Sequence, residues 1–197
     1  MQIQTFTGHD ILNLIDDVAR LRIAVFRDYP YLYEGSLDYE KHYLDKLSQS
    51  ESGVVVAARD ETRVVGASTA LAMVEAEEAF QRPFLEAGAD LNDYFYFAES
   101  VLLPEYRGRG VGREFFRRRE AHAANIGNFK FLCFCAVDRP GNHPCRPEDY
   151  RPLDSFWESE HFFRRPDLQT TYPWLDRGDE QETEKSMTFW VKELGKD

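Results

Sequence analysis

The sequence predicts an α/β protein (α+β in some classifications) built on a mixed, mostly antiparallel central sheet flanked by helices. Hydrophobic residues make up 43% of its 197 residues and include 15 Phe and 10 Tyr, which is typical of a packed core. Two β-branched runs within residues 52–74 predict an antiparallel hairpin. A strand, a glycine-rich turn, a helix and another strand follow within residues 93–137, which predicts a parallel crossover unit. We therefore expect a single domain over residues 1–197.

The N-terminal part is predicted to contain a short strand and two helices before the hairpin. Residues 3–7 alternate in polarity, as a strand does. Apolar residues then recur at three- and four-residue steps from Ile11 to Val25, which indicates an amphipathic helix that ends before Pro30. The same spacing predicts a second helix over residues 37–50.

The rest of the chain alternates between strands and helices. Pro83 interrupts a helical pattern, so a short or broken helix is expected around it rather than a continuous one. The proline-rich residues 138–152 form the one long stretch without a periodic pattern. The other predicted elements are strands over residues 93–103, 129–137, 170–174 and 185–194 and helices over residues 110–126 and 153–163.

The net charge and the cysteine content indicate which binding partners and which cellular compartment are favoured. The net charge of −11 disfavours affinity for nucleic acid or an anionic membrane, because such binding depends on neutralising phosphates. No apolar run approaches the roughly 20 residues that span a bilayer, and the N-terminus does not resemble a signal peptide. Three cysteines do not make a disulfide framework. We expect a cytoplasmic protein without nucleic-acid or membrane partners; a homodimer is compatible with the sequence.

The segment PEYRGRGVGREFFRRRE, residues 104–120, gathers six arginines around three glycines. A glycine turn that opens a helix presents unpaired backbone N–H groups and the positive end of the helix dipole, a geometry that binds phosphate. The Walker pattern is absent, and the spacing of Gly108, Gly110 and Gly112 does not fit the dinucleotide fingerprint. The pattern [QR]-x-x-G-x-[GA] does fit, with Arg107 as its first residue.

The wider stretch VLLPEYRGRGVG, together with the order of predicted elements, resembles the coenzyme A loop and fold of the GNAT N-acetyltransferases. The resemblance covers nearly the whole chain and is close over residues 99–112. It implies a GNAT-like sheet with a splayed parallel pair, acetyl-CoA as co-substrate and no metal. The alternative is a tight strand-to-helix connection with a solvated basic face, in which Glu114 and Arg118 would pair. The residues that the resemblance places at the coenzyme are Val101, Leu102, Arg107, Gly108, Arg109, Gly110, Val111, Gly112 and Arg113.

Catalysis requires a base for the acceptor amine, and Glu99 is the candidate. It lies on the strand before the glycine turn, in an apolar and aromatic setting. The alternative is a buried carboxylate paired with an arginine or a backbone N–H. The tyrosine that often acts as the acid in this family is replaced here by Trp157, and His161 stands where glycine is usual. Substitutes for that acid are Tyr150, Tyr172, His143 or a water molecule.

The acceptor site implied by the resemblance includes the loop after the first helix. RDYPYLYEG supplies Asp28, Tyr29, Tyr31 and Tyr33, an acidic and aromatic set suited to a cationic amine. A tyrosine-rich surface turn is the alternative. The acceptor is thus expected to be a small molecule or peptide with a primary amine. A non-catalytic acyl-CoA-binding sensor and a transferase of longer acyl groups remain as other functions.

A metal site built on the cysteines and a cysteine nucleophile are the less favoured chemistries. Cys133 and Cys135 form a C-x-C pair on a strand, whereas zinc knuckles use two to four intervening residues. Buried small hydrophobic side chains are the simpler interpretation of this pair. Cys135 could accept the acetyl group, but no base for it is visible in the sequence.

Overall fold

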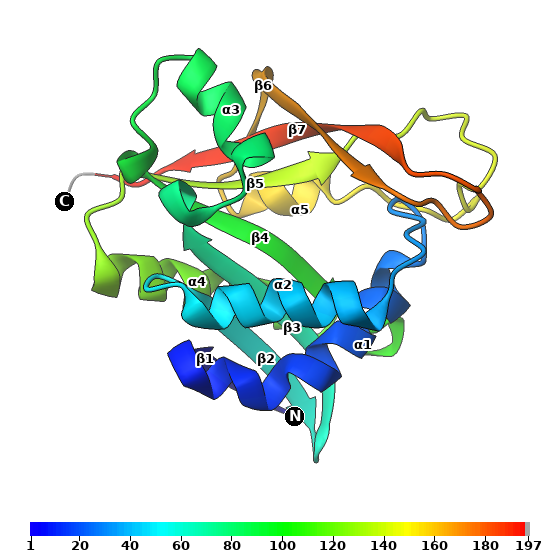
Figure 1. The fold of residues 1–197 in the computed structure, drawn as a ribbon, viewed down its shortest axis with the longest axis horizontal. Helices are drawn as coiled ribbons and strands as arrows, with labels where there is room; N and C mark the ends of the chain where they lie inside the picture. The colour runs from blue at the N-terminus through cyan, green and yellow to red at the C-terminus, as the bar shows by residue number, and fades with distance from the viewer. Residues whose placement is uncertain (196–197) are drawn as a thin grey trace.

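A seven-stranded mixed sheet forms the centre of the protein in the computed structural model, which describes residues 1–195 (Figure 1). The strand order is β1-β2-β3-β4-β5-β7-β6, and every neighbouring pair is antiparallel except β4 and β5. The predicted fold class is therefore confirmed. The strands are β1 Gln2–Thr7, β2 Val54–Asp60, β3 Arg63–Ala72, β4 Tyr94–Leu102, β5 Phe131–Val137, β6 Phe163–Trp174 and β7 Thr183–Glu193.

Helices cover both faces of the sheet (Figure 1). α1 and α2 pack on one face, and α4 and α5 pack on the other, each through its own cluster of buried apolar side chains. α3 lies over the β6 end of the sheet. Between residues 1 and 195 no helix is both long and apolar enough to cross a membrane. The α-helices are α1 Ile15–Phe26, α2 Leu37–Gln49, α3 Glu78–Glu86, α4 Val111–Ile126 and α5 Asp154–Ser159.

Two predicted elements differ in extent from those observed. The first helical pattern divides into a 3-10 helix, Gly8–Leu14, followed by α1, and both segments bury their apolar side chains. The last-but-one strand, expected over residues 170–174, spans the whole of β6. β6 lies at the edge of the sheet and contains Pro166 and Pro173, which an edge strand tolerates because one side needs no ladder hydrogen bonds.

α3 is short, as predicted, but it continues through Pro83 without a break. Proline has no N–H, so the carbonyl of Ala79 loses the helical hydrogen bond that residue 83 would give it. The hydroxyl of Thr170 on β6 donates to that carbonyl at 2.5 Å. The hydrogen-bond donor for the Ala79 carbonyl therefore comes from a strand far away in the sequence. This explains why the local pattern suggested a break.

The centre of the sheet carries two irregularities next to each other. On the β3 side of β4, Thr69 pairs with Glu99 and Leu71 pairs with Tyr96, so β4 has one extra residue in a bulge. On the other side, β4 and β5 pair only as far as Tyr96 and Cys133, and the described chain shows no pairing beyond them. The parallel strands thus separate just before Glu99, as expected for the splayed pair.

Candidate active site

The glycine turn after β4 has the conformation that its sequence predicts. Gly108 and Gly110 have φ of 73° and 80°, in the left-handed region that glycine adopts without a penalty. A Cβ atom on either residue would meet no atom within 4 Å, so the space over the turn is open. The first backbone hydrogen bond of α4 runs from the Glu114 amide to the Gly110 carbonyl, 3.2 Å. The amides of residues 111–113 therefore point out of the helix without intrahelical partners.

The arginines of this segment other than Arg119 are exposed or half-buried, and each contacts a nearby carbonyl or carboxylate group. Arg107 donates to the Leu102 carbonyl and Arg109 to the Glu105 carbonyl, at 3.2 and 2.9 Å. Arg113 pairs with Glu160 at 3.0 Å and stays largely exposed. Arg117 and Arg118 both pair with Glu114, as the spacing of Arg118 predicts, and together they lower the pKa of Glu114 to about 2.

Arg119 differs from its neighbours because it is buried beneath the sheet, with 1% of its surface exposed. Its guanidinium group donates to the carbonyls of Thr69 and Glu99 at 3.3 and 3.2 Å and to the Ser100 hydroxyl at 2.9 Å. It also lies over the ring of Phe97, 4.1 Å from the centroid. Burial lowers the pKa of Arg119 to about 9, so it remains cationic at neutral pH. Arg119 thereby stabilises the bulge of β4 from the α4 face of the sheet.

A cavity of about 550 Å³ lies on the α1 and α2 face and reaches the place where β4 and β5 separate. Ala98 and Glu99 of β4 and Cys135 of β5 line it at that point. α1, α2, α3, β6 and the loop after α1 supply its other walls. The size lies in the range of small-molecule sites. The cavity could admit an acceptor to the gap from the face opposite α4.

Glu99 lies in this cavity with both carboxylate oxygens engaged. Tyr43 of α2 donates its hydroxyl to one oxygen at 2.8 Å, and Arg22 of α1 forms a close ion pair with the other. Arg22 also forms a close ion pair with Glu40 of α2 and lies over the Tyr43 ring, 4.4 Å from its centroid. Burial raises the pKa of the Tyr43 phenol well above its ordinary value, and the charge of Glu99 adds to this effect. We refer to Arg22, Glu40, Tyr43 and Glu99 as the buried quartet.

Three members of the buried quartet were not among the residues singled out in the sequence. Arg22 and Glu40 occupy apolar positions of two amphipathic helices: Val18 lies four residues before Arg22, and Leu44 lies four residues after Glu40. A charged residue on a buried helical face must find a partner, and these two residues have opposite charges. That combination is the signal that could have identified the pair before the structure was known.

In the same cavity, a hydrogen-bonded bridge joins α2, β6 and the N-cap residue of α3. The hydroxyls of Tyr39 and Tyr172 lie 3.0 Å apart, and Tyr172 donates to Glu77 at 2.7 Å. Phe80 of α3 stacks on Tyr172 with ring centroids 5.1 Å apart. Burial, followed by the hydrogen bonds to Tyr39 and Glu77, raises the pKa of Tyr172. Among the proposed substitutes for the missing acid, Tyr172 lines the cavity, whereas Tyr150 and His143 do not.

Of the tyrosines in the loop after α1, two line the cavity and one does not. Tyr31 and Tyr33 line the cavity, as does Glu34. Asp28 and Tyr29 are not among the cavity residues; Tyr29 instead packs edge-on against Tyr150, with centroids 4.6 Å apart. The proline-rich segment after β5 therefore lies against this loop.

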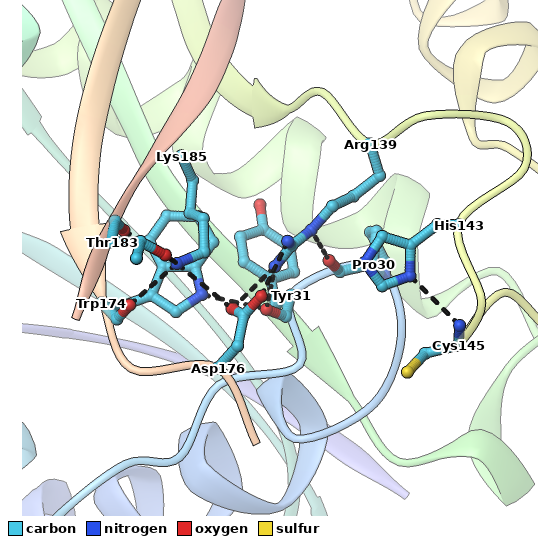
Figure 2. Close-up of polar contacts among 9 residues, drawn as sticks. All are labelled: Pro30, Tyr31, Arg139, His143, Cys145, Trp174, Asp176, Thr183 and Lys185. Carbon is cyan, nitrogen blue, oxygen red and sulfur yellow. Dashed lines mark hydrogen bonds and ion pairs between the residues drawn. The ribbon is translucent and has the colours of Figure 1, made fainter. Parts of the chain in front are cut away.

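A buried polar network holds this wall of the cavity in place (Figure 2). Arg139, which follows β5, donates to the carbonyls of Pro30 and Tyr31 and forms a bidentate ion pair with Asp176, each contact at 2.8 Å. Trp174 donates its indole N–H to the Tyr31 carbonyl at 3.0 Å. Figure 2 shows how this network joins three segments that are distant in the sequence, and it orients Tyr31 and Trp174 toward the cavity.

Trp157 and His161 show how α5 accommodates its departures from the family pattern. Trp157 packs against Phe134 and Trp190, with ring centroids 5.0 Å away in both cases, on the α4 side of the sheet. His161 has a φ of 68°, the left-handed conformation that glycine would adopt more easily. The helix thus ends in the geometry expected for a glycine, while the usual tyrosine position contributes to packing.

Two of the three cysteines are buried, and the third is exposed. Cys133 and Cys135 are buried and unoxidised, and burial raises the pKa of both thiols well above the ordinary value, which disfavours the reactive thiolate. Cys145 is exposed, and its amide donates to His143 at 3.2 Å (Figure 2). Within residues 1–195 no three His, Cys, Asp or Glu side chains are grouped so that they could hold a metal ion.

The site thus combines a parallel strand pair that opens next to a glycine turn with a cavity that leads to the gap. A sequence profile of the Acetyltransferase (GNAT) family matches residues 18–147. The chain therefore belongs to the GNAT acetyltransferase family, which uses acetyl-CoA as co-substrate. No curated protein sequence matches the chain.

Solved structures agree with this fold at low sequence identity. A ribosomal-protein-alanine N-acetyltransferase from Brucella melitensis is 17% identical, with a TM-score of 0.61 over 98% of this chain and 100% of that one. The yncA protein from Salmonella typhimurium, whose structure contains its cofactor acetyl-CoA, is 10% identical, with a TM-score of 0.61 over 100% and 96%. An aminoglycoside 6'-acetyltransferase type Ii is 14% identical, with a TM-score of 0.60 over 100% of both chains.

Proposed function

We propose that the protein is an N-acetyltransferase that moves the acetyl group of acetyl-CoA directly to a primary amine. The observation that carries this proposal is the cavity that reaches the gap between β4 and β5 from one face, while the glycine turn opens on the other side of β4. Two reactants could then meet at the gap from opposite directions, which favours direct transfer over a relay through Cys135. The whole of residues 1–197 would act as this one domain.

The residues around the turn fit a coenzyme A molecule. The open space over Gly108 and Gly110 and the free amides of residues 111–113 suit a pyrophosphate, which helix N-termini bind well. Arg109 and Arg113 would add positive charge there. Val101 and Leu102 pair with β3 on one edge and with no strand of the described chain on the other, so the pantetheine arm could pair there if it replaces the Arg107 side chain at the Leu102 carbonyl. The bound coenzyme would supply a thioester whose carbonyl carbon is open to attack.

Glu99 is our candidate for the general base. As the amine nitrogen forms its bond to the acetyl carbon, the amine must lose a proton, and the carbon–sulfur bond then breaks to release coenzyme A. Tyr43 donates its hydroxyl to Glu99, so the proton could reach the carboxylate through that hydroxyl or directly. Tyr172 lines the cavity, but its raised pKa and its hydrogen bond to Glu77 disfavour proton donation to the leaving thiolate, so a water molecule is the better candidate for the acid.

Glu99→Gln tests this role. We expect kcat to fall by roughly 100-fold or more, because general-base catalysis typically contributes 10²–10⁴-fold, while the Kd for acetyl-CoA changes little. Steady-state release of free thiol over a panel of amines, with calorimetry for acetyl-CoA, measures both quantities. Glu86→Gln, an exposed site on α3, is the matched control. A Glu99→Gln enzyme with unchanged kcat would show that the carboxylate is only a structural partner of Arg22.

The packing role of Trp157 supports a second candidate, a module that binds acyl-CoA without transferring the acyl group. That function predicts acetyl-CoA binding with no acetylated product from polyamines, amino acids, aminoglycosides or peptides. Mass spectrometry of such a panel separates the two functions. Competition among CoA thioesters of different chain length addresses transfer of a longer acyl group.

A further inference from the structure

The buried quartet carries one more negative charge than positive charge. Glu40 and Glu99 share a single cation, Arg22, and all three are largely buried. Glu40 is entirely buried, with 0% of its surface exposed, and it lines the cavity. A carboxylate pair that shares one guanidinium group inside a protein is incompletely neutralised, and a buried charge without a partner is costly.

One atom of the quartet locates this excess charge. Oε2 of Glu40 accepts from Arg22, whereas Oε1 is buried and forms no ion pair among residues 1–195. The phenol of Tyr33 lies beside this carboxylate, because burial, the charge of Glu40 and a side-chain hydrogen bond to Glu40 together raise the pKa of Tyr33. A buried carboxylate that shares its one cation and otherwise meets a neutral phenol is incompletely neutralised, and a ligand cation in the cavity could complete the neutralisation.

The rest of the cavity extends the same charge pattern toward its opening. Six glutamates line it against one arginine and one lysine. Arg27 pairs with Glu34 at 3.0 Å from outside the lining, yet the remaining carboxylates still outnumber the cations. Glu75, at the end of the 3-10 helix before α3, and Glu77, the N-cap residue of α3, form a second acidic group, and Glu77 also accepts from Tyr172. A single ammonium group cannot neutralise both regions.

The cavity offers little to an acceptor that carries a carboxylate. Arg22 is already bound by two glutamates, and it is the only arginine that lines the described cavity. Lys46, the other cation of the lining, is exposed. Tyrosine rings form much of the remaining wall, and such rings attract ammonium groups through their faces. An amino acid would therefore bring its carboxylate next to glutamates.

We propose that the acceptor is a diamine or polyamine without a carboxylate, and that the negative charge of Glu40 attracts one of its ammonium groups. Glu75 and Glu77 attract a further ammonium group toward the opening of the cavity. This inference rests on the proposed function, because it names the acceptor class of the same site. Glu40 is a specificity-determining residue in this scheme, and Glu99 keeps its separate role toward the reacting amine.

Three amines of equal chain length test the proposal on the wild-type protein. 1,5-Diaminopentane, pentylamine and L-lysine differ only in the second amino group or in the added carboxylate. We expect the diamine to bind at least about tenfold more tightly than either of the other two, in calorimetry with and without bound coenzyme A, since charged partners contribute several kcal/mol in desolvated sites. Equal or tighter binding of lysine or of pentylamine overturns the proposal.

Glu40→Gln tests the assignment of the residue. It keeps the size of the side chain and should lower the affinity for 1,5-diaminopentane by at least about tenfold, whereas Glu86→Gln should not. Unchanged affinity in Glu40→Gln overturns the role of Glu40. The ligand series on the wild-type protein decides the acceptor class even if this variant fails to fold. Intact acetyl-CoA binding with no diamine preference contradicts this inference alone, whereas lack of acetyl-CoA binding contradicts the proposed function.

Discussion

At the scale of single residues, similar side chains in one short segment have different surroundings. The six arginines of residues 104–120 look alike in the sequence, yet Arg119 is buried behind the β4 bulge and Arg113 is exposed beside α5. The helical periodicity already indicated that Arg117 to Arg119 span several faces. Only the position of α4 against the sheet determines which of those faces is covered.

Arg113→Gln should weaken acetyl-CoA binding by about twofold to fivefold. The side chain lies beside the free amides of the first turn of α4, and a charge at a solvent-exposed helix terminus contributes roughly 0.3–1 kcal/mol, rarely more. Calorimetric titration with acetyl-CoA at low and high salt measures the effect, which should shrink as salt rises. Arg82→Gln on α3 removes the same charge far from the turn and serves as the control. Equal affinity of Arg113→Gln and wild type would refute the assignment.

At the scale of elements, local patterns identified most helices and strands, and the exceptions involve a distant partner. α1, α2 and α4 follow the three- and four-residue apolar spacing of their sequences, because one face of each packs on the sheet. α3 is different, since the donor that replaces the missing Pro83 N–H is Thr170 on β6. A replacement hydrogen bond from a residue so distant in the chain cannot be recognised from the local sequence pattern.

Thr170→Val should lower the free energy of unfolding by about 1–3 kcal/mol, because it leaves the Ala79 carbonyl without a partner at a buried position. In a Pro83→Ala background the same change should cost less, since residue 83 then has an N–H that can reach that carbonyl. Urea unfolding of the two single variants and the double variant gives the coupling energy. Additive effects would mean that the hydroxyl does not replace the helical hydrogen bond.

At the scale of the whole molecule, the sheet consists of two parts joined by a short parallel ladder. β1 to β4 form one part and β5 to β7 the other, and only three residue pairs connect β4 with β5. The cavity lies on the α1 and α2 face of this junction, and the glycine turn leads into α4, which packs on the other face. Ligands at the proposed site would therefore contact both parts.

Acetyl-CoA should protect the amides of residues 97–102 and 107–113 from hydrogen exchange and raise the melting temperature. The first segment lies at the open edge of β4, and the second contains the turn, so both would gain partners from the coenzyme. Mass spectrometry of deuterium uptake with and without acetyl-CoA measures this protection. β1, at the far edge of the sheet, provides the internal reference. Protection spread evenly over the sheet would argue against a binding site at the junction.

The sequence by itself determined the fold class, the order of most elements and the glycine turn, because these depend on local periodicity and on backbone freedom at Gly108 and Gly110. It also indicated Glu99 and the tyrosines of the loop after α1. The tertiary structure decided which of these residues share a cavity: Tyr31 and Tyr33 line it with Glu99, whereas Asp28 and Tyr29 do not. It alone brought Arg22 and Glu40 to Glu99, because an ion pair between two helices and a strand depends on packing, which no local pattern contains.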